Sequence, residues 1–219
     1  MEKLKGMRFV TSFSGGKDSI LAMHRAVGAG LEPHSLITAQ KIGSDKSWAH
    51  SMGPDLLKKV SDSLGIPLNL IETTGESYAE NIEKALLDAR SKGAQVCVFG
   101  DIDLMGHYEW CSKRCEKAGI IPCFPLWMEE RKKVVYEFIN HGYSAIIRTV
   151  DKTRMSERFL GRILTKETAD EIERYEVDIC GENGEYHTFV YDGPLFAKKV
   201  VYTINGRNIR DKYVSLQLG

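Results

Sequence analysis

Strand-like and helix-like segments alternate through the first 128 residues of this 219-residue chain. Short β-prone apolar runs are each followed by a run with apolar residues at helical spacing. We expect strands at 7–13, 34–39, 67–72, 95–100 and 121–126, and helices at 17–29, 54–64, 77–92 and 106–118. This alternation is typical of right-handed βαβ units, so it predicts a Rossmann-like α/β fold, a mostly parallel sheet with helices on both faces.

The pattern changes from about residue 129 onward. We expect a helix at 131–141, a strand at 144–150, a helix near 165–175, and strands at 186–191, 198–203 and 212–217. The dipeptide Asn205-Gly206 is a typical hairpin turn. This mixture predicts a smaller α+β unit, so we expect two domains, 1–128 and 129–219.

A glycine-rich turn separates the first expected strand from the first expected helix. It reads Ser14-Gly15-Gly16-Lys17-Asp18-Ser19. Adjacent glycines let the backbone approach an anion closely, and N–H groups at the start of a helix bind phosphate. These six residues are therefore candidates for binding a nucleotide, and the alternative is a plain turn capped by Ser14 or Asp18. The Walker A and G-x-G-x-x-G patterns do not occur.

A second candidate, Gly100-Asp101, follows the fourth expected strand. Ligands of parallel sheets lie beyond the carboxyl ends of the strands, at the switch point in strand order. Because this strand is expected beside the first, Asp101 would face the same phosphates as Asp18. The alternative is that Asp101 belongs to a helix N-cap region.

The segment 181–188 is the other chemically dense part of the chain. It reads Gly181-Glu182-Asn183-Gly184-Glu185-Tyr186-His187-Thr188. Two carboxylates, an amide, an imidazole and a hydroxyl lie next to two glycines, and an apolar strand that should hold them rigidly follows. The alternative is an ordinary polar hairpin.

Composition restricts the partners and the compartment. Lysine plus arginine equals aspartate plus glutamate, at 30 each, which argues against nucleic acid as a partner. No apolar run is long enough to span a membrane and no signal-peptide stretch begins the chain, so we expect a cytoplasmic protein. Five cysteines without a C-x-x-C pair are expected to be free, buried thiols. His107, Cys111 and Cys115 share a helix face, where core packing is favoured over zinc because a fourth ligand is lacking.

Several motifs resemble a known family. The turn at 14–19 resembles the PP-loop of the N-type ATP pyrophosphatases, which have an adenine nucleotide alpha hydrolase-like fold. Further motifs resemble the diphthine–ammonia ligase family, namely Gly100-Asp101-Ile102, Phe124-Pro125-Leu126-Trp127, Leu160-Gly161-Arg162 and the block 181–196. The resemblance extends from about residue 7 to 196.

This resemblance implies ATP-dependent amide formation. A carboxylate attacks the α-phosphate of ATP, pyrophosphate leaves, and ammonia then displaces AMP from the acyl-adenylate. In the ligases the acid is diphthine, the modified histidine of elongation factor 2. No glutaminase domain is evident, so free ammonium is the expected nitrogen donor, and a homodimer stays open.

The resemblance and the chemistry together assign roles to the candidate residues. Ser14, Gly15, Gly16, Lys17, Asp18, Ser19, Gly100 and Asp101 would bind ATP, and Asp18 would hold Mg²⁺. Asp18, Glu182, Glu185 and His187 would be catalytic, with a carboxylate holding ammonium and taking its proton. Asn183, Gly184, Tyr186 and Thr188 would bind the acid.

One departure puts the acid in doubt. The diphthine ligases carry E-G-G-E-[YF]-E-T, whereas this chain has Asn183 and His187 in place of the second residue and the last acid. The version found here is similar to a sister branch linked to cobalamin metabolism. Imidazole titrates near neutral pH, so His187 would change the local charge by about one unit.

Two other functions are compatible with such a fold. A PP-loop enzyme that modifies tRNA would need a basic surface, and often cysteine pairs, both of which the sequence lacks. A nucleotide-binding sensor would have no use for the second acidic segment. We therefore expect a ligase for ATP, ammonium and a carboxylic acid, either diphthine or a small cobalamin-related molecule.

Overall fold

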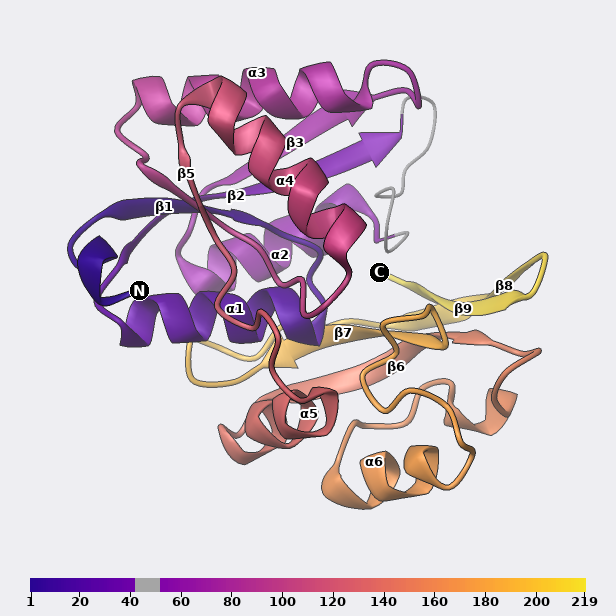
Figure 1. Cartoon of the computed structure of the whole chain (residues 1–219). Coiled ribbons are helices and arrows are strands. Elements are labelled where there is room, and N and C mark those ends of the chain that lie inside the picture. Colours follow the sequence, from indigo (N-terminus) through magenta and orange to yellow (C-terminus); the bar gives the residue numbers. More distant parts are fainter. Residues whose placement is uncertain (42–51) are drawn as a thin grey trace.

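A five-stranded parallel sheet forms the first half of the protein. The computed structural model describes residues 1–41 and 52–219 (Figure 1). The strand order is β3-β2-β1-β4-β5. The strands are β1 (Arg8–Ser12), β2 (Glu32–Lys41), β3 (Leu68–Thr73), β4 (Val96–Val98) and β5 (Ile121–Cys123). The expected parallel α/β fold is confirmed, and each strand overlaps its predicted range.

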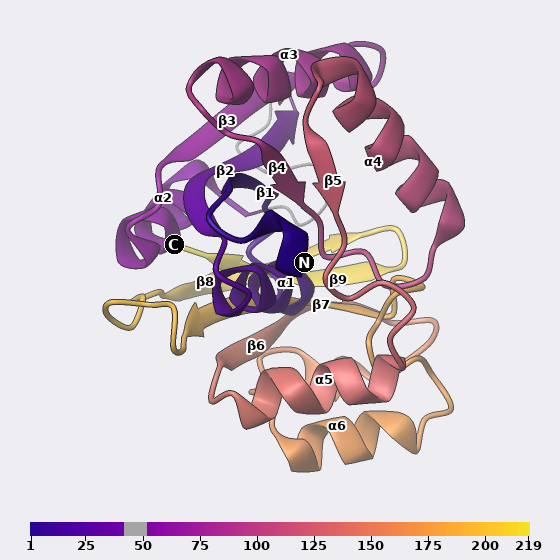
Figure 2. The same cartoon turned by 60° about the vertical axis from the view of Figure 1, so that its left-hand side comes forward.

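Helices cover both faces of this sheet, as Figures 1 and 2 show. The helices are α1 (Lys17–Gly28), α2 (Pro54–Leu64), α3 (Tyr78–Ser91) and α4 (Met105–Ala118). Successive strand residues point to opposite faces, so Phe9 packs in the core with α1 and α2, while Val10 packs in the core with α3 and α4. Both faces are buried, which explains the continuous apolar runs in the sequence.

A four-stranded antiparallel sheet forms the second half, in the order β7-β6-β9-β8. The second half contains the helices α5 (Arg131–Asn140) and α6 (Lys166–Glu173). Its strands are β6 (Ser144–Asp151), β7 (Tyr186–Asp192), β8 (Ile204–Arg210) and β9 (Tyr213–Leu218). Two short 3-10 helices, Glu2–Leu4 and Glu157–Phe159, complete the described structure. No helix in these described parts has the length and apolar character that a membrane crossing requires.

The two halves share one apolar core. Buried side chains from Phe9 to Leu216 form a single cluster that includes α1, α5 and both sheets. The backbone N–H of Val190 in β7 also donates to the carbonyl of Gly15, at 3.0 Å. The division at residue 128 stays a prediction, because this core continues across it.

Two predictions for the C-terminal segment are wrong. Residues 198–203 form no strand, because their hydrogen bonds go to separate places, among them Val200 N–H to Tyr191 O at 2.8 Å. Asn205-Gly206 lies inside β8, where the register shifts and Gly206 has φ 151°. The hairpin turns instead at Asp211 and the residue after it, and Asp211 adopts φ 54°, a conformation that aspartate tolerates.

Gly100 allows the loop after β4 to touch the start of α1. A Cβ at this position would lie 2.8 Å from the backbone carbon of Asp18 and 2.8 Å from the nitrogen of Ser19. Backbone atoms at the start of a helix have no rotamer with which to move aside. A side chain here would therefore push the two loops apart.

We expect Gly100→Ala to lower the free energy of unfolding by about 1–3 kcal/mol, the usual cost of overpacking. The measurement is urea unfolding followed by circular dichroism. Gly28→Ala is the matched control, because a Cβ added there would meet no atom within 4 Å and the residue ends α1. That control should be neutral or slightly stabilising. Equal losses in both variants would contradict the packing role of Gly100.

Candidate active site

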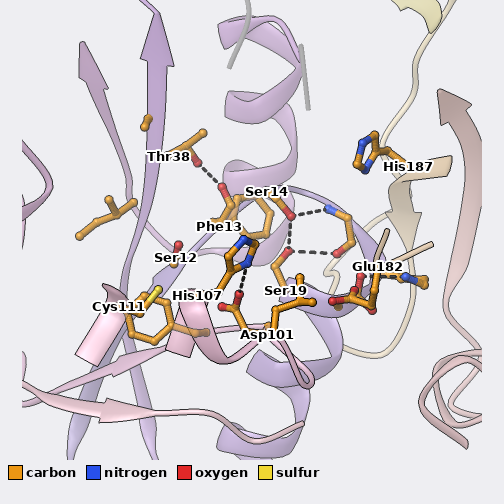
Figure 3. A pocket seen from close by; sticks show the side chains of 18 of the residues that line it. Ser12, Phe13, Ser14, Ser19, Thr38, Asp101, His107, Cys111, Glu182 and His187 are labelled. Carbon is orange, nitrogen blue, oxygen red and sulfur yellow. Dashed lines mark hydrogen bonds and ion pairs between the residues drawn. The ribbon is translucent and has the colours of Figure 1, made fainter. Parts of the chain in front are cut away.

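A cavity of about 500 Å³ lies between the carboxyl ends of the parallel strands and the loop that precedes β7 (Figure 3). It brings together candidates from both halves of the sequence. Those that line it are Ser14, Gly16, Lys17, Asp18, Ser19, Gly100, Asp101, Glu182, Tyr186, His187 and Thr188. Residues more than 160 positions apart thus face one space.

Four candidates lie outside the lining formed by the described residues. They are Gly15, Asn183, Gly184 and Glu185. Glu185 is 1% exposed and accepts hydrogen bonds from the backbone N–H of Asn183 at 3.1 Å and from its amide Nδ2 at 3.3 Å. Arg154 pairs with the same carboxylate at 3.2 Å. Glu185 therefore holds the shape of the loop from behind.

The turn at 14–19 leaves the start of α1 open to the cavity. The hydroxyl of Ser14 accepts from Gly16 N–H at 3.2 Å and donates to the Ser19 hydroxyl at 3.1 Å. Ser19 in turn donates to the Gly16 carbonyl at 3.0 Å. Gly16 is the N-cap and brings no side chain of its own, and the N–H of Lys17, the first residue of the helix, donates to the Thr188 hydroxyl at 3.0 Å. The simple capping role considered for Ser14 or Asp18 is therefore not what this turn adopts.

Lys17 connects the two loops that face each other. Its side chain is 3% exposed, and its ammonium donates to Asp18 Oδ2 at 2.8 Å and to the carbonyl of Cys180. Its backbone N–H donates to the Thr188 hydroxyl at 3.0 Å. Burial acts to lower the pKa of Lys17, but the nearby acidic groups, Asp18 first, outweigh it and raise that pKa. The lysine is thus a buried, charged group that connects α1 with the segment just before the 181–188 loop.

Three carboxylates lie close enough in this cavity to influence one another. Burial and the charge of Asp18 raise the pKa of Glu182 to about 8, against the effect of Lys17. Burial also raises the pKa of Asp101, with a smaller contribution from Asp18. Asp18 Oδ1 is buried without a hydrogen-bond partner among the described residues. Such crowded negative charge favours a cation at this point.

These residues fit Mg²⁺ in the way that nucleotide enzymes hold it. No group of three or more histidine, cysteine or acidic side chains in the described chain is arranged to hold a metal alone. Mg²⁺ usually takes one or two carboxylates, with water and substrate phosphates completing its shell. The unsatisfied Asp18 oxygen at the start of α1 is suited to such a shell.

His187 lines the cavity as a neutral imidazole. Burial, then the charges of Arg148 and Lys17, lower its pKa to about 4. An imidazole can titrate near neutral pH, but burial keeps this one neutral there, and the sequence does not reveal how deeply it is buried. His187 offers a hydrogen bond without a charge at physiological pH.

An ionic network that the sequence analysis missed holds the second loop. Asp178 accepts from the N–H groups of Cys180 at 3.0 Å and Glu182 at 2.8 Å. Arg131, at the start of α5, bridges Asp178 and Asp103, each at 2.7 Å. The only sequence signal was an aspartate four residues before Glu182, in position to cap a turn.

One part of the cavity wall is apolar. Tyr78 and Trp110 pack with ring centroids 5.4 Å apart, near Ile37, Ile82 and Phe99. The sequence analysis assigned none of these side chains to a site. Because they line the same space as the turn at 14–19, they can enclose a flat apolar group of a molecule that also contacts that turn.

The cysteines are free and buried, as expected. Cys111 lines the cavity, and Cys115 packs against the sheet in the core with α3 and α4. His107 instead places Nδ1 3.0 Å from Asp101 Oδ1 at the cavity wall. The three residues therefore do not act as one group.

Sequence comparison assigns the chain to a family. The pattern of the diphthamide synthase N-terminal domain matches residues 7–122, and that of the diphthamide synthase C-terminal domain matches residues 130–214. The chain belongs to the diphthamide synthase family. The family expected from the motifs is thereby confirmed.

Relatives in the family carry the name diphthine–ammonia ligase. The Danio rerio protein is 27% identical over 222 residues, covering 89% of this chain and 86% of the relative. The Homo sapiens protein is 25% identical, covering 89% and 82%. The Schizosaccharomyces pombe protein is 25% identical and covers 90% of this chain, which spans only 36% of that longer relative. A solved structure from Methanocaldococcus jannaschii, titled as a predicted subunit of tRNA methyltransferase, aligns with a TM-score of 0.45 at 17% identity, over 84% of this chain and 96% of that one.

We expect Lys17→Met to lower the free energy of unfolding by about 3 kcal/mol, because it leaves a carboxylate without its buried partner. Lys58→Met is the matched control, since Lys58 forms an exposed pair with Asp62 on α2 and should cost little. Urea unfolding measures both. A loss of stability in Lys17→Met no larger than that in the control would contradict the role of Lys17 in connecting the two loops.

The raised pKa of Glu182 predicts a dependence of stability on pH. From its ordinary pKa of 4.5 up to about 8, the folded protein holds this proton while the unfolded chain has released it. The free energy of unfolding should therefore fall as the pH rises through that range. Glu182→Gln should make this fall shallower, measured by urea unfolding at several pH values. An unchanged slope would show that Glu182 is ionised in the folded protein.

Proposed function

We propose that this protein is an ATP-dependent ligase that joins ammonia to a carboxylic acid. The observation that carries the proposal is the single cavity in which the open start of α1 faces Glu182 of the second loop. One side has the donors that a pyrophosphate group needs, and the other has a carboxylate with a raised pKa. Membership of the diphthamide synthase family and the names of the relatives support the same chemistry.

ATP would occupy the cavity along its length. Its phosphates fit the turn at 14–19, where Ser14, Gly16 and Ser19 line the cavity at the start of α1. Its base fits the apolar end beside Tyr78 and Trp110. Asp18, with Asp101 nearby, would hold Mg²⁺, which when bound neutralises charge on the departing pyrophosphate.

The reaction has two steps. A carboxylate oxygen of the acid attacks the α-phosphorus, which forms the acyl-adenylate and breaks the bond to pyrophosphate. Ammonia then attacks the acyl carbon, AMP leaves, and the surplus proton from ammonium passes to a base. Glu182 is suited to this because a pKa of about 8 lies near the operating pH, where a carboxylate both takes and releases a proton readily.

The acid is diphthine on elongation factor 2 or a smaller molecule of the cobalamin-linked branch. The relatives' names favour diphthine. His187 favours a different acid, because a neutral imidazole replaces a carboxylate at the cavity wall. Either acid would be met in the cytoplasm, which we infer as the compartment.

We expect the protein to convert ATP to AMP and pyrophosphate only when both ammonium and its acid are present, measured by chromatography of the nucleotides. Asp18→Asn should lower this rate on the order of a hundredfold or more, because it removes the cation-binding charge. Asp62→Asn, on the exposed face of α2, is the control and should leave the rate unchanged.

Formation of ADP and phosphate would contradict adenylation. Elongation factor 2 carrying diphthine and small corrinoid acids are tested side by side as the acid. The one that supports AMP formation identifies the branch. Binding of ATP without turnover under either acid would favour a nucleotide sensor instead.

A further inference from the structure

Arg131 connects the two loops that carry the cavity residues Asp101 and Glu182. Its guanidinium donates to both carboxylate oxygens of Asp103, each at 2.7 Å, and to Asp178 Oδ2 at 2.7 Å. Asp103 lies two residues after Asp101 in the loop that follows β4, and Asp178 lies four residues before Glu182. Asp101 and Glu182 line the cavity, whereas the three bridging residues are not part of the lining formed by the described chain.

Asp178 extends this connection to the backbone of Glu182. Its carboxylate accepts from the N–H of Cys180 at 3.0 Å and from that of Glu182 at 2.8 Å, and its carbonyl accepts from Gly181 N–H at 3.0 Å. The backbone carbonyl of Arg131 also accepts a hydrogen bond from the thiol of Cys180, at 2.9 Å. These hydrogen bonds fix the backbone from which the Glu182 side chain enters the cavity.

The geometry of this bridge is rigid and partly shielded from water. The side chain of Asp178 is 8% exposed, and those of Arg131 and Asp103 are 26% and 30% exposed. Two parallel N–H···O bonds from a guanidinium fix the angle to a carboxylate as well as the distance. Loss of the guanidinium would leave Asp178 without its counter-charge, so the N–H groups that it accepts from would lose an acceptor that is held in place.

The two cavity carboxylates differ in how much they depend on the bridge. Asp101 has a support of its own, because His107 Nδ1 lies 3.0 Å from its Oδ1 and the preceding Gly100 packs against the start of α1. Within the part of the chain that the structure describes, Glu182 is held through its backbone N–H by Asp178, and its carboxylate is not used for structure. Loss of the bridge should therefore displace Glu182 more than Asp101.

We propose that Arg131 is a positioning residue for the ammonia step, and that it acts on Glu182 through Asp178. This inference rests on the proposed ligase activity, in which Glu182 takes the proton of ammonium. The hydrogen bonds of the Arg131 side chain go to residues outside the turn at 14–19, so the step in which ATP reacts depends on other contacts. A displacement of about 1 Å in a reacting group can slow a reaction on the order of a hundredfold.

The test measures the two steps of the reaction separately in Arg131→Met. At saturating ammonium, the rate of AMP formation with the acid that supports it should fall about tenfold to a hundredfold. The KM for ATP should stay unchanged. Exchange of labelled pyrophosphate into ATP, measured with the acid but without ammonium, reports adenylation alone and should also stay unchanged.

Arg25→Met is the matched control. Arg25 likewise joins two acidic side chains, with Nε 2.8 Å from Glu137 and Nη1 3.3 Å from Glu129, and it lies outside the cavity lining formed by the described residues. This control should lose a similar amount of stability, measured as the melting temperature, and should keep both rates. Arg131→Lys should recover part of the rate of AMP formation, since an ammonium keeps the charge without the planar geometry.

Equal falls in pyrophosphate exchange and AMP formation in Arg131→Met would overturn the proposal, because they would show a purely structural role. Unchanged AMP formation would overturn it as well.

A second measurement needs no substrate. Hydrogen exchange at the backbone N–H groups of Cys180 and Glu182, followed by NMR, should become about tenfold faster or more in Arg131→Met and stay unchanged in Arg25→Met. Unchanged exchange in both variants would overturn the proposal. Failure of the unaltered protein to form AMP with any acid would count against the proposed ligase activity instead, and the hydrogen exchange would still decide whether Arg131 holds Glu182 in place.

Discussion

The buried ammonium of Lys17 determines how the two halves of the cavity meet. The turn at 14–19 follows a strand of the parallel sheet, whereas Glu182 and His187 belong to a loop and a strand of the antiparallel sheet. Lys17 reaches Asp18 on its own helix and the carbonyl of Cys180 on that loop, and its backbone N–H bonds Thr188. A charge buried between two loops resists their separation, because separation would leave Asp18 and the carbonyl without their partner.

The acidic residues in and behind the cavity make different interactions. Asp18 accepts a hydrogen bond from Lys17 through Oδ2, and its Oδ1 has no hydrogen-bond partner among the described residues. Glu182 is held through its backbone N–H by Asp178, so its carboxylate is not used for structure. Glu185, two positions from His187, accepts a hydrogen bond from the backbone N–H of Asn183 and forms an ion pair with Arg154. Crowded carboxylates destabilise a fold, and their retention here is typical of a site that binds cations.

The sequence predicted what depends on local pattern and missed what depends on distant partners. The strands of the parallel sheet are buried on both faces and end at turns, so apolar runs located β1 to β5 within a few residues. Asn205-Gly206 misled because the same dipeptide suits a bulge as well as a turn. Lys17 was expected at the phosphates, but Cys180, 163 residues away, draws its ammonium inward. Arg131 carried no signal, because its partners Asp103 and Asp178 lie far from it in the sequence.

In the second loop, the residues that fix the shape of the backbone are separate from those that face the cavity. Asp178 and Glu185 fix the backbone of the loop, and neither of them lines the cavity formed by the described residues. A change from glutamate to histidine at position 187 therefore alters the cavity wall, while the hydrogen bonds that Asp178 and Glu185 accept from the loop stay in place. A neutral imidazole there carries no charge at physiological pH, whereas a carboxylate in its place would add one negative charge to the wall. Exchanging this one side chain would thus change the charge that the cavity wall presents, while the turn at 14–19 on the opposite loop stays the same.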